Sequence, residues 1–220
     1  MKLAEAKEKL RPFIGVKFAE LMKDKNIDDI IVNKGKTGQL LEILLGMKNT
    51  SAKLDFEDGE LKTNKCKSLG QPMETMFIMQ VMSVIDELCE RKDFYTTDLY
   101  KKIDHILYVP IFKDNPNPRE WYIIDVLDVA INTNPDLKEI KEQLEKDYYT
   151  ICDKVINDIA TKGRIHTSSG KYIQIRTKDS KPYHPIKSNG KEVSNKNYAF
   201  YFKKEFMIAI VKILRGASWL

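Results

Sequence analysis

The sequence predicts an α/β protein in which a sheet is flanked by helices. Short apolar runs such as His105–Phe112 (HILYVPIF) predict strands, and a long charged stretch with helical periodicity, Asp136–Ala160, predicts a helix. Of the 220 residues, 42% are hydrophobic and 31% are charged, a balance typical of a soluble protein with a sizeable core. The chain shows no internal repeat and no low-complexity linker, so we expect one interwoven body.

The helices are predicted from apolar residues that recur at helical spacing. They cover Lys2–Asp24, Thr37–Leu45, Asp136–Ala160 and Glu205–Leu214. The first range contains Pro12 and Gly15 and is expected to form two short helices. The second ends at Gly46, since glycine readily adopts the left-handed conformation found at helix C-termini. The third is expected to be interrupted near Tyr148.

The strands are predicted from apolar runs bounded by turn residues. They cover Lys53–Phe56, Glu60–Asn64, Met76–Val84, His105–Phe112, Trp121–Val126, Tyr172–Arg176 and Tyr198–Phe202. The first two flank Glu57, Asp58 and Gly59 and therefore predict a β-hairpin. The next three are expected to belong to one sheet. The last two flank a polar loop, Thr177–Asn197.

Positive charge gathers in the C-terminal part of the chain. From Thr161 to Leu220 there are 13 Lys or Arg residues and three acidic residues, a net charge of +10, whereas the whole chain carries +5. Duplex DNA presents one negative charge per ~1.7 Å of its axis, so a concentrated positive segment favours binding to a polyanion. A solvated lysine-rich face is the alternative that composition leaves open.

The sequence lacks the features of a membrane or secreted protein. No apolar run approaches the ~18 residues of a membrane-spanning helix, and the start MKLAEAKEKLRPF predicts an amphipathic helix rather than a signal peptide. We therefore expect a cytoplasmic protein with no membrane partner. Cys66, Cys89 and Cys152 are odd in number and far apart, which supports neither a disulfide framework nor a CxxC metal site.

A charged cluster in the segment LDFEDGELKTNK carries the clearest chemical signal. Asp55 ends one strand of the predicted hairpin, and Glu60 and Lys62 alternate on the next, so their side chains share a face. Two carboxylates directed at one spot repel each other unless a divalent cation such as Mg²⁺ lies between them. A lysine beside the cation can orient water or stabilise charge on a phosphate. The pattern suits metal-assisted phosphodiester hydrolysis, although any exposed charged hairpin can show it.

Six blocks of sequence extend the pattern from about Asn33 to Leu214. They are KGKTGQLLEILLG, LDFEDGELKT, KSLGQPMETMF, KKIDHILYVPI, GKYIQIRTK and NYAFYFKKEF. In this order they resemble the MutH family of mismatch-repair endonucleases and the restriction endonucleases related to it. The resemblance implies a PD-(D/E)xK restriction-endonuclease-like fold, with a mixed central sheet flanked by helices and two lobes around a DNA cleft. It also implies one domain over residues 1–220, with catalysis mainly in 1–110 and DNA recognition mainly in 161–220.

The resemblance also implies roles for individual residues. The expected catalytic residues are Glu42, Asp55, Glu60, Lys62 and Lys102, and the expected metal ligands are Asp55 and Glu60. Glu42 matches a carboxylate on the preceding helix, whereas an ordinary helix carboxylate exposed to solvent is the alternative. Lys102 matches a further active-site lysine, although Lys101 beside it leaves a one-residue ambiguity. The compact spacing between the two ligands departs from the mismatch-repair members and leaves Asp58 as a less favoured ligand.

The DNA contacts implied by the resemblance lie in the basic segment. Arg176 and Lys178 follow the strand KYIQI, where the family reads bases, and arginine can donate two hydrogen bonds to guanine O6 and N7. Contacts to phosphates or solvent alone are the alternative. Tyr201 matches a tyrosine near the adenine whose methylation is sensed, although a core aromatic residue fits the strand equally well. Lys203 and Lys204 are expected to hold phosphates.

The sequence thus predicts a sequence-specific, magnesium-dependent endonuclease that acts on double-stranded DNA. A type II restriction enzyme that cuts at GATC is the favoured interpretation. A mismatch-repair nickase that cuts the unmethylated strand is one alternative, and a catalytically inactive DNA-binding pseudo-nuclease is another. Retention of all four residue types at 42, 55, 60 and 62 argues against the pseudo-nuclease. We expect a monomer in solution or a dimer on a palindromic site.

Overall fold

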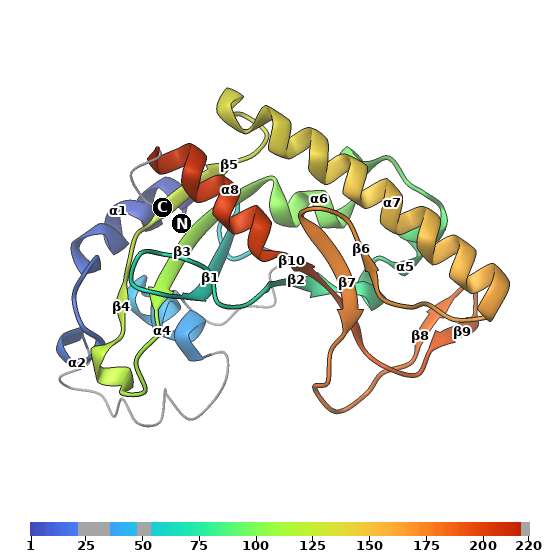
Figure 1. The fold of residues 1–220 in the computed structure, drawn as a ribbon, viewed down its shortest axis with the longest axis horizontal. Coiled ribbons are helices and arrows are strands. Elements are labelled where there is room, and N and C mark those ends of the chain that lie inside the picture. The colour runs from blue at the N-terminus through green and yellow to red at the C-terminus, as the bar shows by residue number, and fades with distance from the viewer. Residues whose placement is uncertain (22–35, 48–53, 217–220) are drawn as a thin grey trace. The chain divides into compact units, whose positions relative to one another are not determined.

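The structure is a computed structural model, and it describes residues 1–21, 36–47 and 54–216. The chain divides into two compact units that alternate along the sequence. Unit 1 comprises Met1–Glu74, His105–Ala130 and Val211–Leu220, and unit 2 comprises Thr75–Asp104 and Ile131–Ile210. Each unit contains its own sheet with helices against it (Figure 1), which confirms the predicted α/β class.

Unit 1 is built around one central strand. Its strands are β1 (Glu60–Cys66), β3 (His105–Phe112), β4 (Tyr122–Ile123) and β5 (Leu127–Ala130). β1 pairs with β3 in parallel, and β4 and β5 pair with β3 in antiparallel orientation. Residues 106–111 of β3 are all buried. The apolar run HILYVPIF therefore forms the strand that the sequence predicts, and the structure places it at the centre of the sheet, covered on both faces.

The helices of unit 1 pack against different parts of that unit. They are α1 (Leu3–Leu10), α2 (Phe18–Leu21) and α4 (Lys36–Leu44). α4 lies against β1. α1 lies against β3 and β5 and buries Leu3, Ala6 and Leu10, one face at helical spacing (Figure 1). Gly46 follows α4 with a φ of 68°, which confirms the predicted glycine stop. The two short helices are confirmed up to residue 21, and residues 22–24 of that prediction lie outside the described residues.

Unit 2 combines a four-stranded sheet with a separate hairpin. The sheet runs in the order β2 (Met76–Gln80), β10 (Tyr198–Phe202), β7 (Ile173–Thr177) and β6 (Ser168–Ser169), and the hairpin consists of β8 (Ile186–Ser188) and β9 (Lys191–Ser194). The helices are α5 (Ile85–Cys89), α6 (Asp98–Ile103) and α7 (Lys138–Lys162). α8 (Lys204–Arg215) continues from unit 2 into unit 1. Short 3-10 helices occupy Arg11–Phe13, Val81–Ser83, Phe94–Thr96, Pro118–Glu120 and Pro135–Leu137.

The expected break in the long helix is wrong, because α7 is one continuous helix of 25 residues. Tyr148 is fully buried, and its ring centroid lies 5.3 Å from that of Phe94. Packing of this aromatic side chain outweighs the modest helix propensity of the sequence DYYTI. The helix lies along β6 and β7 (Figure 1) and ends at Gly163, whose φ is 68°.

The predicted hairpin is also wrong. The strand Lys53–Phe56 is not formed in the described part of the chain, since residues 54–58 form bends and residue 53 lies outside that part. The Asp55 carboxylate accepts a hydrogen bond from the backbone of β1, and that bond holds the segment in a turn. At Gly59 an added Cβ would lie 2.6 Å from the carbonyl oxygen of His105, so only glycine fits this close approach. β1 takes its partner from β3 instead.

The expectation of a single sheet fails at β2. The strand predicted over Met76–Val84 ends at Gln80 and continues as a 3-10 helix. It pairs with β10 in unit 2 rather than with the strands of unit 1. The polar loop Thr177–Asn197 contains the β8–β9 hairpin, which the sequence analysis missed. The strands predicted at 172–176 and 198–202 are confirmed as β7 and β10, within one residue.

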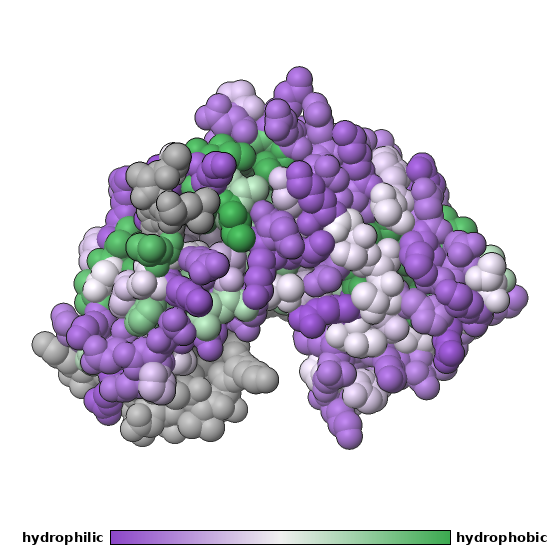
Figure 2. Space-filling view, viewed as in Figure 1, coloured by the Kyte–Doolittle hydropathy of each residue, from purple (hydrophilic) through white to green (hydrophobic). Residues whose placement is uncertain are grey.

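Hydrophilic side chains dominate the face of the molecule seen in Figure 2. Within the described ranges, no helix is both long enough and apolar enough to cross a membrane. All three cysteines are free, as their spacing predicts.

Candidate active site and DNA interface

β1 carries a nearly buried ion pair in unit 1. Glu60 and Lys62 alternate along the strand, and Lys62 Nζ donates to Glu60 Oε1 at 2.7 Å. Their side chains are only 5% and 11% exposed. The shared face that the sequence predicts is confirmed. Because removing two charges from water is unfavourable by several kcal/mol per ion, a buried pair is weak evidence for a stabilising role and favours a functional one.

Two further carboxylates influence each other in the same unit. Asp55 precedes β1, and its Oδ2 accepts a hydrogen bond from Leu61 N at 2.9 Å, which fixes the carboxylate beside the start of the strand. Glu42 is half-buried on α4. Burial raises the pKa of Glu42, and the negative charge of Asp55 raises this pKa further. The Glu42 and Asp55 carboxylates are therefore close enough to interact electrostatically.

Asp58 has a different task from its neighbours. Its Oδ1 accepts a hydrogen bond from Leu3 N at 2.8 Å, at the start of α1. The first backbone N–H groups of a helix lack partners within the helix, so this carboxylate stabilises the N-terminus of α1. The structure therefore gives Asp58 a structural role and agrees with its place as the less favoured ligand.

The carboxylates suit a cation that is shared with a substrate. Among the residues that the structure describes, no group of three or more His, Cys, Asp or Glu side chains is placed to hold a metal ion. Mg²⁺ is commonly held by one or two protein carboxylates, with water and substrate phosphates completing its shell. Asp55 and Glu60 both offer oxygen donors at the start of β1. Their chemistry fits this mode and does not fit a cage built from protein alone.

Lys102 lies on α6 in unit 2, whereas the other four expected catalytic residues lie in unit 1. The neighbouring Lys101 is exposed, and its Nζ donates to Asp98 Oδ1 at 2.8 Å along the same helix. Lys102 is half-buried. The two neighbouring lysines therefore differ in their exposure.

A cluster of cations and aromatic rings lies on the sheet of unit 2. Arg176 Nη2 donates to Thr75 Oγ1 at 2.9 Å, and its Cζ lies 4.3 Å from the centroid of the Tyr201 ring. Lys178 Nζ lies 4.4 Å from the centroid of the Phe77 ring. We call these five residues the cation–ring cluster. Such contacts contribute about 0.5–1 kcal/mol each at exposed sites, so they hold the cationic groups in defined positions.

The two rings of the cation–ring cluster touch each other. Phe77 of β2 is the register partner of Tyr201 of β10, and their centroids lie 5.8 Å apart in an edge-to-face arrangement. Tyr201 is 9% exposed and Phe77 is 37% exposed. Burial raises the pKa of Tyr201, and the Arg176 guanidinium acts in the opposite direction. The buried Tyr201 ring therefore packs against the Arg176 guanidinium, and the Phe77 ring is exposed to solvent.

Sequence reasoning missed Thr75 and Phe77. The strand MFIMQ offers a signal for Phe77, because Met76 and Ile78 on either side of it are buried and alternate residues of a strand face opposite ways. An exposed aromatic residue at the alternate position is therefore available to a ligand. No sequence signal identifies Thr75, whose role depends on a partner 101 residues away.

The two lysines expected at phosphates differ in the structure. Lys203 is half-buried, and its Nζ donates to the Gly170 carbonyl oxygen at 3.0 Å. Its backbone N–H also donates to Tyr172 O at 2.7 Å. Lys204 is exposed at the start of α8. Lys203 thus helps to hold the turn before β7, and Lys204 offers its charge to solvent.

A buried carboxylate of α7 fixes the start of β7. Asp147 is 2% exposed, and its oxygens accept hydrogen bonds from the backbone N–H groups of Lys171, Tyr172 and Ile173 at 2.5–3.1 Å. Gln143 Nε2 also donates to it at 2.8 Å. Since β7 carries Arg176, Asp147 connects the long helix to the cation–ring cluster. The sequence analysis missed this residue.

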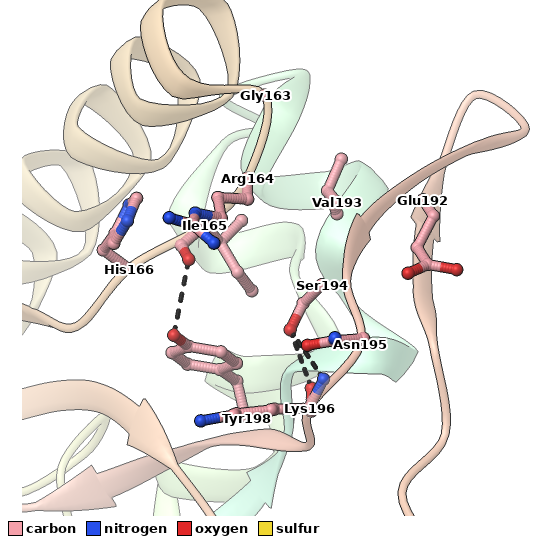
Figure 3. Close-up of a pocket in the computed structure, with 10 residues that line it drawn as sticks. All are labelled: Gly163, Arg164, Ile165, His166, Glu192, Val193, Ser194, Asn195, Lys196 and Tyr198. Carbon is pink, nitrogen blue, oxygen red and sulfur yellow. Dashed lines mark hydrogen bonds between the residues drawn. The ribbon is translucent and has the colours of Figure 1, made fainter.

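A separate cavity of about 410 Å³ lies beside the end of α7 in unit 2 (Figure 3). It is lined by Gly163, Arg164, Ile165, His166, Glu192, Val193, Ser194, Asn195, Lys196 and Tyr198. Figure 3 shows the Tyr198 hydroxyl directed at the Ile165 carbonyl, and the distance between the two oxygens is 3.3 Å. None of the expected site residues lines this cavity.

The mixed α/β fold is consistent with the restriction-endonuclease-like class, and unit 1 carries the Glu60–Lys62 pair with Asp55 beside the same strand. Residues 45–147 match the model of the family described as "DNA mismatch repair enzyme MutH". The chain is also 25% identical to a DNA mismatch repair protein MutH of Haemophilus ducreyi, over 95% of this chain and 92% of that protein. It is 27% identical to the MutH protein of Haemophilus influenzae, over 90% and 89% of the two chains, and 26% identical to that of Escherichia coli O6:K15:H31, over 81% and 77%. These similarities support a MutH-like nuclease family for the chain, as the six sequence blocks imply.

Proposed function

We propose that the protein is a magnesium-dependent endonuclease that hydrolyses a phosphodiester bond of double-stranded DNA. The observation that carries the proposal is the nearly buried Glu60–Lys62 pair, with Asp55 beside the same strand. A charged pair is retained in a nearly buried place chiefly where its charges are used. The relatives are named as DNA mismatch repair proteins, which supports DNA as the substrate.

In this proposal each expected catalytic residue has a defined task. Asp55 and Glu60 would hold Mg²⁺ through carboxylate oxygens, and the ion would supply Lewis-acid chemistry for the water and the phosphate. Without DNA, Lys62 forms an ion pair with Glu60. In the DNA complex it orients the attacking water or the scissile phosphate. Glu42, whose pKa is raised, accepts a proton from water more readily than an ordinary glutamate. Lys102 stabilises the charge on the phosphate.

The cation–ring cluster supplies DNA recognition in the proposal. Arg176 is held by Thr75 and Tyr201, so its guanidinium is ordered before DNA binds. An ordered arginine can donate two hydrogen bonds to guanine in the major groove with little loss of side-chain entropy. Phe77 exposes a ring next to Lys178 that can contact a base edge. Lys204 contacts phosphate, which positions the duplex without reading its sequence.

The favoured target is GATC, and the favoured activity is that of a type II restriction enzyme acting as a dimer on the palindrome. The mismatch-repair names of the relatives favour the second candidate, a nickase that cuts the unmethylated strand as a monomer. A pseudo-nuclease that binds DNA without cutting it is the third. The three differ in what they leave behind: a double-strand break, a nick or intact DNA.

One experiment separates these candidates. Duplexes with a single GATC site, either unmethylated or methylated at adenine on one strand, are incubated with the protein and Mg²⁺, and both strands are mapped at nucleotide resolution. A duplex without GATC is the control. Cleavage of both strands at the site supports the restriction enzyme, and cleavage of only the unmethylated strand supports the nickase. Intact duplexes, or equal cleavage of the control, contradict the proposed function.

A further inference from the structure

The loop between β7 and β8 in unit 2 is held by hydrogen bonds rather than by buried side chains. Residues 179–185 are all exposed, so no hydrophobic burial fixes them. A cavity of about 220 Å³ lies between this loop and the end of β2. Its walls include Ser180, Pro182 and His184 of the loop and Met82 of the following 3-10 helix. The loop is therefore not packed onto the sheet.

One asparagine makes the contacts that hold the loop. Asn197 Nδ2 donates to Ser180 O at 2.7 Å and to Pro182 O at 3.0 Å, and its Oδ1 accepts from His184 N at 3.0 Å. Its own carbonyl oxygen accepts from Lys178 N at 2.8 Å. The residue is only 9% exposed, directly before β10. Both the nitrogen and the oxygen of the Asn197 side-chain amide thus bind the loop. The Asn197 backbone carbonyl also binds Lys178, the first residue of the loop.

The loop begins at the cation–ring cluster. Lys178, whose backbone is bound to Asn197, is also the residue whose Nζ lies over the Phe77 ring. The loop then exposes Lys181, Tyr183 and His184, side chains that can contact phosphates and base edges. A loop that is shaped before binding avoids the entropy loss of ordering during association. The shape of the loop should therefore affect binding most where its side chains must contact particular base pairs.

We propose that Asn197 is a positioning residue that presets the loop from Lys178 to His184 for sequence-specific contact with duplex DNA. The proposal rests on the proposed function, because it takes DNA as the ligand. Asn197 touches no base itself. It sets the positions of Lys181, Tyr183 and His184 relative to Lys178 through three side-chain hydrogen bonds and one backbone hydrogen bond.

Binding to a GATC duplex and to a duplex of shuffled sequence tests the proposal, with the full chain in Ca²⁺ so that cleavage does not interfere. Asn197→Ala removes all three side-chain hydrogen bonds that hold the loop, so we expect the affinity for the GATC duplex to fall at least tenfold. Affinity for the shuffled duplex should change less than threefold, since the loop keeps its charges. Asn195→Ala, an exposed neighbour, is the matched control and should bind both duplexes like the wild type.

A second variant separates loop geometry from net charge. Asn197→Asp keeps the acceptor for His184 but places an anionic oxygen against the carbonyl oxygens of Ser180 and Pro182. If geometry decides, the loss on the GATC duplex exceeds the loss on the shuffled duplex in this variant as well. Equal losses on both duplexes would show an effect of charge alone and overturn the proposal.

Amide hydrogen exchange guards against a purely structural effect. In Asn197→Ala the amide of His184 should exchange at least tenfold faster, whereas amides in β10 should be unchanged. Faster exchange throughout β10, with equal losses on both duplexes, would overturn the proposal in favour of general destabilisation. A wild type that prefers GATC together with an Asn197→Ala variant that keeps this preference overturns the inference alone. A wild type that binds neither duplex overturns the proposed function as well.

Discussion

Lys62 Nζ lies 2.7 Å from Glu60 Oε1, and both side chains are nearly buried on the same face of β1. Lys62 thus places a positive charge beside Glu60, the carboxylate that the proposed function assigns to the metal. In the proposed function, Lys62 and the metal would both interact with the Glu60 carboxylate. Lys62 supplies a counter-charge to the Glu60 carboxylate in this nearly buried place.

The first prediction concerns the stability of this pair. Lys62→Ala leaves the Glu60 carboxylate nearly buried without its lysine, so we expect the free energy of unfolding to fall by about 3 kcal/mol or more. The double variant Glu60→Gln, Lys62→Met replaces both charges by neutral groups and should lie within about 1.5 kcal/mol of the wild type. Urea denaturation of all three proteins measures this. Unchanged stability in Lys62→Ala would mean that the pair is solvated.

The second prediction concerns pH. The pKa of Glu42 is raised by burial and by Asp55, so the folded state favours the protonated carboxyl. The stabilisation from this group is present at low pH and is lost as pH rises through the raised pKa. We therefore expect Glu42→Gln to raise the melting temperature at pH 7 in metal-free buffer, with a gain that shrinks towards pH 4. The exposed Glu8→Gln is the control and should show no such trend, and a gain that is independent of pH would contradict the assignment.

The third prediction concerns the carboxylate that fixes β7. Asp147→Ala leaves the N–H groups of Lys171, Tyr172 and Ile173 without their acceptor. A buried unsatisfied donor costs about 1–3 kcal/mol, so the loss of stability should be about 3 kcal/mol or more. Asp153 on the same helix forms an exposed ion pair with Arg91, and Asp153→Ala should cost about 1 kcal/mol at most. Similar losses in both variants by chemical denaturation would argue against the buried role.

The fourth prediction separates base reading from phosphate binding. Arg176→Ala should weaken binding to a GATC duplex by about 1–3 kcal/mol and binding to unrelated DNA much less. Lys204→Ala should weaken both alike and make the slope of log K against log salt shallower by about 0.9. Lys204 is the cleaner comparison because Lys203 is also bonded to Gly170. Binding isotherms at two salt concentrations provide the test, and equal losses for Arg176→Ala on both duplexes would remove its reading role.

The sequence predicted the elements whose burial is continuous along the chain. β3 and β10 are apolar over almost their whole length, so local pattern and tertiary structure agree there. Helical periodicity also located α7, although the break expected near Tyr148 does not form. The hairpin before β1 was predicted from neighbouring residues, yet β1 pairs in parallel with β3, some 46 residues later, through Glu60 and Ile106. Local sequence carries no signal for such a distant partner.

The candidate site follows the same division. Glu60 and Lys62 were predicted to share a face because the period of a strand alone determines it. Thr75, Asp147 and Asn197 were missed, because each acts on residues that the chain brings close only after folding. Their side chains are common in surface loops and helices, so nothing in the sequence distinguishes them. The contacts of the folded chain identify them.

Cleavage of an unmethylated GATC duplex by Asp55→Asn and Asp58→Asn, each with Mg²⁺ and with EDTA, tests the central claim most directly. The two aspartates lie three residues apart, and each accepts a backbone hydrogen bond. Of these two aspartates, only Asp55 is assigned to the metal. The cleavage rate of Asp55→Asn should therefore fall at least about 100-fold, whereas Asp58→Asn should cut like the wild type. All activity should vanish in EDTA. Wild-type cleavage in EDTA, or full activity in Asp55→Asn, would contradict the account.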